Sequence, residues 1–199
     1  AYLKILKPYI RDTPLLVNQM IEQGKNILFE GAQGTFLDLD HGTYPFVTSS
    51  NTLAGGACAG TGIGPTRINE VLGIVKAYTT RVGSGPFPTE LLDNDGDLLQ
   101  SEGNEFGATT GRPRRCGWFD ALLVRQAVRL NGISSMAVMK LDVLDKFDTL
   151  KIAVSYRLSN GEHTENLPRS LENVTPVLEE MPGWKCNSAG ITEYDQLPR

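Results

Sequence analysis

Three short apolar runs, each followed at once by a polar or glycine-rich loop, constrain the fold of this chain most strongly. The runs are residues 26–30, 74–82 and 136–139. The loops that follow them are residues 31–35, 83–88 and 140–142. Helical patterns cover 13–24 and 120–131, and alternation of such runs with helices predicts an α/β fold with a central, mostly parallel sheet. The carboxyl ends of parallel strands meet at one edge, so we expect these loops to lie together there.

A peripheral β-hairpin and long glycine-rich loops are expected outside this sheet. Residues 152–158 and 162–165 flank Asn160-Gly161, a dipeptide typical of tight hairpin turns. Residues 38–64 are rich in Gly, Thr, Ser and Asn without sustained periodicity, which predicts a long irregular segment. From Pro168 onward, prolines are expected to break the chain into turns and short pieces.

Composition restricts the partners and the compartment. The 199 residues are 40% hydrophobic, enough for a globular core, and the formal net charge is −4. An acidic chain has no general attraction for polyanions, so we expect no nucleic-acid partner. Cys58, Cys116 and Cys186 are odd in number and widely spaced, which favours the reducing cytoplasm. No run approaches the roughly 20 apolar residues of a membrane span, so no membrane partner is expected.

The loop Gly107-Ala-Thr-Thr-Gly-Arg-Pro-Arg-Arg-Cys-Gly117 is suited to holding an anion. Its glycines expose backbone N–H groups, and its three arginines offer planar forks of donors that match carboxylates and phosphates. Pro113 stiffens the arginine run and so lowers the entropy lost when a ligand binds. A solvated basic turn beside a helix is the alternative interpretation of the same residues.

Lys140-Leu-Asp142 follows the third apolar run and has a possible use in base recognition. The carboxylate of Asp142 can accept hydrogen bonds from the N1–H and exocyclic amine of guanine, whereas adenine offers an acceptor in place of the N1 donor. The stem of Lys140 can lie across the same base. Alone the tripeptide is weak evidence, because Lys and Asp are common at strand ends.

The sequence offers no obvious catalytic pair or metal site. Asp93-Asn-Asp-Gly-Asp97 departs from the calcium-loop spacing, so a hairpin turn is predicted there. His41 could act as a general base, but a hydrogen-bonded structural role is the more ordinary interpretation, and His163 is expected to be exposed beside the hairpin turn. No zinc ligand grouping and no standard phosphate-binding loop occur. By itself the chain therefore has binding loops without an obvious catalytic pair, and no metal ligand is expected in it.

Six motifs in one order give the chain a resemblance to a known family. They are Phe29-Glu-Gly-Ala-Gln-Gly-Thr35, Asp40-His-Gly-Thr-Tyr-Pro45, Val47-Thr-Ser-Ser-Asn51, Thr80-Arg-Val-Gly-Ser-Gly-Pro-Phe-Pro-Thr89, Gly107-Ala-Thr-Thr-Gly-Arg-Pro-Arg-Arg115 and Lys140-Leu-Asp-Val-Leu-Asp145. Together they resemble adenylosuccinate synthetase over nearly the whole chain. The resemblance implies a P-loop NTPase-like α/β fold, a homodimer, and a ligase that joins IMP to L-aspartate using GTP and Mg²⁺.

The resemblance also implies three sets of binding residues. Those for IMP are Gln33, Thr48, Val82 and Arg112. Those for aspartate are Ala108, Thr109, Thr110, Gly111, Arg112, Pro113 and Arg114. Those for GTP are Arg114, Lys140, Leu141 and Asp142. Many guanine-binding proteins have Asn or Thr before the lysine, so Met139 predicts the loss of one supporting hydrogen bond.

The same resemblance predicts that residues 1–199 are the middle-to-late part of a single α/β domain. The family's aspartate base, its catalytic histidine and its phosphate loop, which binds Mg²⁺, are expected upstream of Ala1, and His41 is not that histidine. A further guanine-site segment is expected beyond Arg199. We therefore expect this chain alone to be inactive.

Two hypotheses about function remain at this point. The first is a GTP-dependent ligase, and the second is a guanine-nucleotide-binding regulatory module without ligase activity. A nucleotide switch has no need for a second small-anion loop, so residues 107–115 favour the ligase. Nucleic-acid binding through the arginines is a third class, which the acidic charge disfavours.

Overall fold

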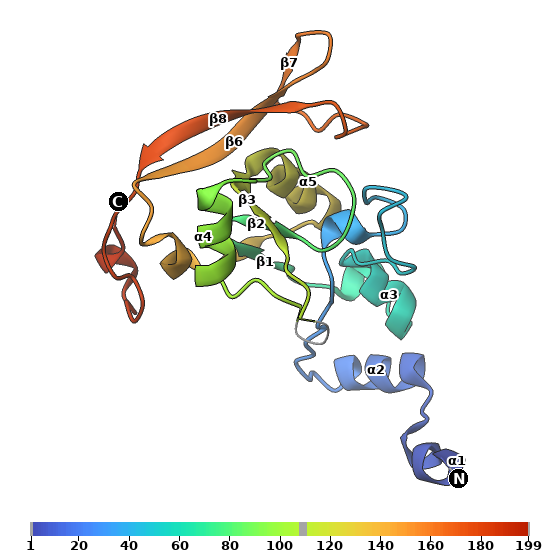
Figure 1. Ribbon diagram of the computed structural model, residues 1–199. Helices are drawn as coiled ribbons and strands as arrows, with labels where there is room; N and C mark the ends of the chain where they lie inside the picture. The colour runs from blue at the N-terminus through green and yellow to red at the C-terminus, as the bar shows by residue number, and fades with distance from the viewer. Residues whose placement is uncertain (1, 108–110, 199) are drawn as a thin grey trace. The chain divides into compact units, whose positions relative to one another are not determined.

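The computed structural model describes residues 2–107 and 111–198, which fall into two compact units. The first unit comprises the chain up to Val71 together with Leu130–Gly132. The second comprises Leu72–Arg129 and the chain from Ile133 onward. Helices and both parallel and antiparallel strand pairs are present, so the predicted α/β class is confirmed (Figure 1).

The first unit is helical and irregular. Its elements are α1 (Tyr2–Leu6), α2 (Thr13–Glu22), α3 (Gly55–Thr61) and the 3₁₀ helices Lys7–Tyr9, Thr35–Leu37 and Pro65–Arg67. The side chain of Asp12 accepts a hydrogen bond from the backbone N–H of Leu15 and so caps α2. The strand predicted over 26–30 is wrong. No described strand pairs with this run, and without a neighbour its backbone cannot form a ladder; Leu28 is 89% exposed.

The second unit holds all the described strands. They are β1 (Leu72–Lys76), β2 (Thr79–Arg81), β3 (Arg115–Gly117), β4 (Phe119–Asp120), β5 (Ser135–Met139), β6 (Thr149–Arg157), β7 (His163–Thr164) and β8 (Thr175–Pro182). The helices are α4 (Asn94–Glu102), α5 (Ala121–Asn131, its last two residues counted in the first unit) and the 3₁₀ helices Leu141–Leu144 and Tyr194–Gln196.

The strands form three small sheets. β1 pairs in parallel with β5, with Lys76 opposite Met139, so the two strands end at the same edge. The predicted run 74–82 divides into β1 and β2, and β2 pairs antiparallel with β3. β6 pairs antiparallel with both β7 and β8 (Figure 1). It also pairs in parallel with β4. The predicted hairpin is thus confirmed as β6 and β7.

Two predictions for the second unit were wrong. The chain after Pro168 contains β8, an eight-residue strand whose prolines, Pro176 and Pro182, lie near its two ends. An edge strand tolerates proline because one side of its backbone needs no ladder bonds. Asp93 does not start a hairpin turn but caps α4, since its Oδ1 accepts from the N–H groups of Asp95 and Gly96.

The prediction for α5 is confirmed. Asp120 Oδ1 accepts hydrogen bonds from Leu122 N and Leu123 N at the start of the helix. Gly132 follows its end with φ of +63°, a conformation that glycine adopts without a steric penalty.

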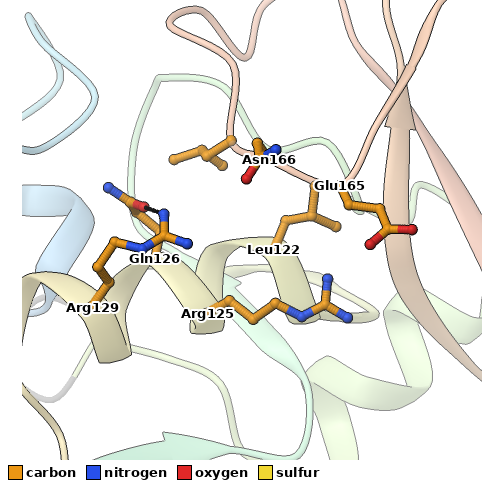
Figure 2. A pocket seen from close by; sticks show the side chains of 7 residues that line it. Leu122, Arg125, Gln126, Arg129, Glu165 and Asn166 are labelled. Carbon is orange, nitrogen blue, oxygen red and sulfur yellow. Dashed lines mark hydrogen bonds between the residues drawn. The ribbon is translucent and has the colours of Figure 1, made fainter.

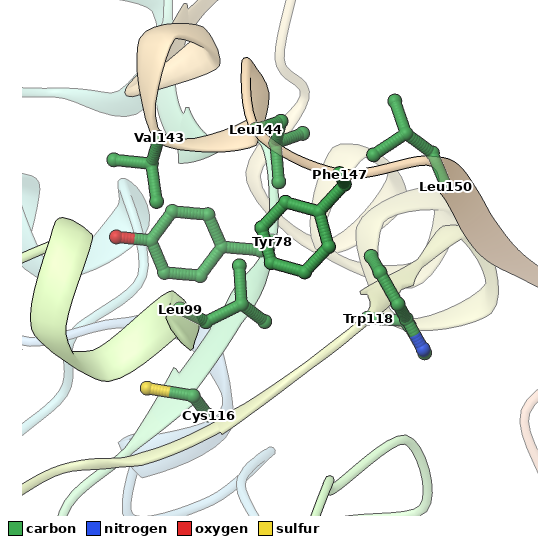
Figure 3. Close-up of a cluster of buried hydrophobic side chains, with 8 residues drawn as sticks. All are labelled: Tyr78, Leu99, Cys116, Trp118, Val143, Leu144, Phe147 and Leu150. Carbon is green, nitrogen blue, oxygen red and sulfur yellow. The ribbon is translucent and has the colours of Figure 1, made fainter. Parts of the chain in front are cut away.

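An aromatic core lies beside the converging strand ends of the second unit. Its buried members are Tyr78, Leu99, Cys116, Trp118, Val143, Leu144, Phe147 and Leu150 (Figure 3). The rings of Trp118 and Phe147 meet edge to face at 5.4 Å between centroids. Burial raises the pKa of the Cys116 thiol to about 11, so it is a protonated packing residue at neutral pH. This core fixes the 3₁₀ helix that follows Lys140 and the end of α4, from which the site described next is built.

Candidate functional site

The loop predicted to hold an anion is closed by a short antiparallel neck. Arg114 N donates to Glu105 O at 2.8 Å, Gly107 N donates to Arg112 O at 2.8 Å, and Phe106 forms a β-bridge with Pro113. Inside the neck, Gly111 N donates to Gly107 O, and Gly111 has φ of +62°. The neck fixes the two ends of the loop before any ligand binds.

Only some of the residues predicted to bind the substrate aspartate belong to the described part of the chain. Ala108, Thr109 and Thr110 lie outside the described residues. Gly111, Arg112, Pro113 and Arg114 lie on the returning side of the neck. Their roles remain predictions.

Beneath the neck lies a buried carboxylate that the sequence analysis did not single out. Glu105 is fully buried and receives hydrogen bonds from four side chains. The donors are Lys76 Nζ at 2.8 Å, Tyr78 Oη at 2.5 Å, Arg114 Nη1 at 2.7 Å and Lys140 Nζ at 3.0 Å. We call Glu105 and these four residues the Glu105 cluster. Glutamate side chains are usually exposed, so the burial of Glu105 could not be expected from its residue type. The four donors are 9 to 35 residues away from Glu105 in sequence, so no local pattern could reveal the cluster.

The charges of the Glu105 cluster explain its ionisation. Burial alone would raise the pKa of Glu105, but the four hydrogen bonds outweigh burial and bring it to about 2. Burial lowers the pKa of Lys76, and Glu105 opposes that effect. Three cations surround one carboxylate, so the cluster carries an excess of two positive charges, and the cationic side chains are 27–35% exposed. The cluster therefore favours an anion at its surface.

Lys140 and Asp142 are placed differently although they are two residues apart. Lys140 has φ of +63°, and its ammonium is bonded to Gly103 O and Glu105 Oε1. Asp142 is exposed and lines a pocket of about 490 Å³. Leu141 lines the same pocket as Asp142. Both residues are predicted to bind GTP, and that role remains a prediction.

The other wall of that pocket comes from the C-terminal part of the chain. Ser188, Ala189, Gly190, Ile191 and Leu197 line it. Asp145 anchors this wall, because its carboxylate accepts from Trp184 Nε1 at 2.6 Å and from Ser188 N at 2.8 Å. Residues 188–197 carry no motif, so the sequence analysis did not identify them. A Trp at 184 and an Asp at the end of Lys140–Asp145 were the only local signals.

The loop after β2 is held by Arg115 rather than left open for a ligand. The Arg115 guanidinium donates to Glu90 Oε1 at 2.6 Å and to the carbonyl oxygens of Gly83 and Gly85. Val82, the predicted ribose contact, precedes this loop and is 55% exposed. Arg114 and Arg115 are each paired with a carboxylate, Glu105 and Glu90 respectively.

In the first unit, Gln33 and Thr48, which are predicted to bind IMP, are linked by hydrogen bonds through Ser50. Ser50 Oγ donates to Gln33 Oε1 at 3.1 Å and lies 2.9 Å from Thr48 Oγ1. Gln33 has φ of +70°, which projects it from the glycine-rich turn. The structure therefore brings Gln33 and Thr48 together through a serine that the sequence analysis did not name.

Asp38 organises the long irregular loop of the same unit. Its Oδ1 accepts from the backbone N–H groups of Asp40 and His41, and its Oδ2 from those of Thr52 and Leu53. Burial favours the neutral acid, yet these four bonds lower the pKa of Asp38 overall. His41 takes part through its backbone, and its side chain is exposed.

A second pocket of the second unit involves none of the predicted site residues. It has a volume of about 230 Å³ and lies between α5 and residues 165–167 (Figure 2). Arg125 and Arg129 project from one side of α5 beside Gln126, and Arg129 Nη1 donates to Gln126 Oε1 at 2.8 Å. Both arginines are exposed, as expected for an i, i+4 pair on a solvated helix face.

The described part of the chain contains no clustered set of metal-ligating side chains and no helix able to span a membrane. No group of three or more His, Cys, Asp or Glu side chains among residues 2–107 and 111–198 could hold a metal ion. None of the described helices combines the length and the apolar character needed to cross a bilayer.

Comparison with known proteins gives one consistent family. The family model described as adenylosuccinate synthetase matches residues 1–199. The adenylosuccinate synthetases of Trichlorobacter lovleyi and Geobacter metallireducens are each 60% identical to this chain, over 99% and 100% of it and 46% of their own length. The chain thus spans about half the length of the curated relatives it matches.

Solved structures agree. The fully ligated adenylosuccinate synthetase of Plasmodium falciparum matches 97% of this chain with a TM-score of 0.94 and 40% identity, over 47% of its own chain. The succinoaminodeoxyadenylate synthetase of cyanophage S-2L, bound to dGMP and to dATP as an energy donor, matches 63% of this chain with a TM-score of 0.54 and 28% identity, over 38% of its own chain.

Proposed function

Because the chain belongs to the adenylosuccinate synthetase family, we propose that it carries binding loops of a ligase that joins IMP to L-aspartate. GTP is the co-substrate, and the products are adenylosuccinate, GDP and phosphate. One observation carries the proposal. Glu105 contacts Lys140 and Arg114 through its carboxylate and the neck of the 107–117 loop through its backbone. A dicarboxylate loop and a guanine-nucleotide tripeptide side by side are what such a ligase requires.

The chemistry explains why both loops are needed. The 6-oxygen of the IMP base is a poor leaving group, so it first attacks the γ-phosphorus of GTP and releases GDP. The aspartate amine then adds at C6, and phosphate leaves with the oxygen. Catalysis of such a sequence depends mainly on positioning and on neutralising the phosphate charge. The partly exposed cations of the Glu105 cluster would supply a fixed positive surface for this purpose.

Specific roles within this proposal follow from placement. Asp142 would accept the N1–H and amine of guanine in the pocket that it shares with Leu141, and Arg114 would meet the GTP phosphates. Gln33 and Thr48 would contact the IMP base and phosphate, with Val82 and Arg112 at its ribose. Ala108, Thr109, Thr110, Gly111, Arg112, Pro113 and Arg114 would form the aspartate loop.

Mg²⁺ would neutralise the GTP phosphates when bound, and no group of three or more His, Cys, Asp or Glu side chains among the described residues could hold it. We infer, from the family, that the full-length protein binds it elsewhere and acts as a cytoplasmic homodimer.

A coupled phosphate-release assay on the full-length protein tests the proposal. We expect release that requires GTP, IMP and aspartate together, with adenylosuccinate as the product. Binding of GTP without any dependence of phosphate release on IMP and aspartate would instead support a guanine-nucleotide-binding regulatory module.

A further inference from the structure

Within the second unit, three segments that are distant in sequence place a cation on Glu105. Lys76 ends β1, Lys140 follows β5, and Arg114 precedes β3. Both carboxylate oxygens are used, since Oε1 accepts from Lys140 and Tyr78, and Oε2 accepts from Arg114. Glu105 is therefore the common partner of two residues assigned to GTP.

The direction of the Lys140 side chain is set by these contacts. An ammonium has three donors, and Lys140 Nζ directs two of them at Gly103 O and Glu105 Oε1. The side chain is 35% exposed, so part of it is open to a ligand while these two contacts fix the position of the ammonium. A base would then pack on the stem, with Asp142 at its edge.

Glu105 also links the nucleotide residues to the anion loop. Its carbonyl oxygen accepts from Arg114 N in the neck, while its carboxylate holds the Arg114 guanidinium. A shift of Glu105 would therefore move Lys140, Arg114 and the start of the 107–117 loop together. Without the carboxylate, three neighbouring cations would lose their shared counter-charge and repel one another.

We propose that Glu105 is a positioning residue for the guanine nucleotide, which holds Lys140 and Arg114 in their binding arrangement without touching the ligand itself. This proposal rests on the proposed function, since it assumes that Lys140 and Arg114 meet GTP. It assigns to Glu105 a role in GTP affinity and, through the neck of the 107–117 loop, in aspartate affinity.

The test is steady-state kinetics of the full-length protein with Glu105→Gln, Lys140→Met and the double variant. Each single change is expected to raise KM for GTP about tenfold while KM for IMP stays within about twofold. The double variant is expected to show about the same tenfold increase, because residues that act as a unit are not additive. An increase near the product of the two single effects would mean that the ammonium of Lys140 meets the nucleotide independently of Glu105, and would overturn the proposal.

Two further variants separate positioning from general damage. Glu90→Gln removes a carboxylate that pairs with Arg115 and touches neither Lys140 nor Arg114, so KM for GTP should stay within about twofold. Glu105→Asp keeps the charge but is one methylene shorter, and we expect about a threefold higher KM for GTP even if Glu105→Gln does not fold. A folded Glu105→Asp enzyme with the unmodified protein's KM for GTP would overturn the proposal. An unmodified full-length protein that does not use GTP would instead refute the proposed function.

Discussion

Two buried carboxylates, Glu105 and Asp38, are stabilised as anions in different ways. Glu105 is surrounded by cationic side chains, whereas Asp38 is bonded to four backbone N–H groups. Burial works against ionisation in both, and the hydrogen bonds reverse that effect. Each residue therefore stabilises a segment that has little regular secondary structure of its own.

Ionisation of Glu105 should make stability fall in acid. Its pKa is about 2 in the folded protein and 4.5 in an unfolded reference, so its contribution is complete above about pH 4.5 and is lost as pH falls through 2. The shift corresponds to on the order of 3 kcal/mol. We expect the difference in unfolding free energy between the unmodified protein and Glu105→Gln, from urea titrations, to shrink by about 2 kcal/mol from pH 7 to pH 3. A difference that does not change with pH would contradict this.

Asp142→Asn should change which base the nucleotide site prefers. The amide of Asn has one accepting oxygen and one donating NH₂ group, so it cannot accept from both the N1–H and the C2 amine of guanine. Xanthine has a carbonyl at C2, so the amide can accept from its N1–H and donate to that carbonyl. We expect GDP affinity of the full-length protein to fall by about tenfold or more and xanthosine diphosphate affinity to rise, as measured by calorimetry. Asp95→Asn, in the first turn of α4, is the matched control and should leave both affinities unchanged. Retained guanine preference in Asp142→Asn would refute the role of Asp142.

At the residue scale, local motifs identified candidate side chains, whose ligand roles stay predictions. Asp142 lines a pocket after a predicted strand, and Gln33 and Thr48 are linked through Ser50. Glu105 could not be predicted, because its function in the structure depends on partners from separate elements. The same applies to the pocket wall at 188–191, which is fixed by a distant carboxylate, Asp145.

At the element scale, prediction succeeded for elements with strong local signals. α5 has a capping Asp120 and is followed by Gly132 with a positive φ. The apolar run 136–139 forms most of β5, but Met136, Val138 and Met139 are exposed, so composition located the strand without predicting its burial. The run 26–30 had the composition of a strand but has no described pairing partner, and pairing cannot be inferred from composition. β8 was missed because its prolines indicate turns unless the strand lies at a sheet edge.

The cap of α4 should be measurable on its own. Asp93→Ala removes the acceptor for the N–H groups of Asp95 and Gly96, and we expect a loss of about 1 kcal/mol in unfolding free energy. Asn94→Ala, one residue further along and exposed, should change it by less than about 0.5 kcal/mol. Equal effects in urea titrations would argue against a capping role for Asp93.

At the scale of the whole molecule, the chain comprises two compact units and about 46% of the length of its relatives. The predicted IMP residues are divided between these units, with Gln33 and Thr48 in the first and Val82 and Arg112 in the second.

Because the chain spans about half the length of its relatives, we expect activity to depend on chain length. We expect the purified 199-residue chain to form no adenylosuccinate and the full-length protein to form it under the same conditions, as followed by product absorbance. The full-length protein with Asp142→Asn, assayed with GTP, serves as a control for weak turnover. Adenylosuccinate formation by the short chain would show that its own loops suffice for catalysis.

The bonds of Asp38 also indicate where the chain can tolerate an insertion. One carboxylate joins the backbone at 40–41 to the backbone at 52–53 and so closes the intervening segment into a ring. The entropic cost of closing a loop rises slowly with its length. Residues added at the exposed tip around Tyr44–Phe46 should therefore lower the free energy of unfolding only slightly. A peptide could therefore be grafted into this tip, provided that Asp38 is left in place.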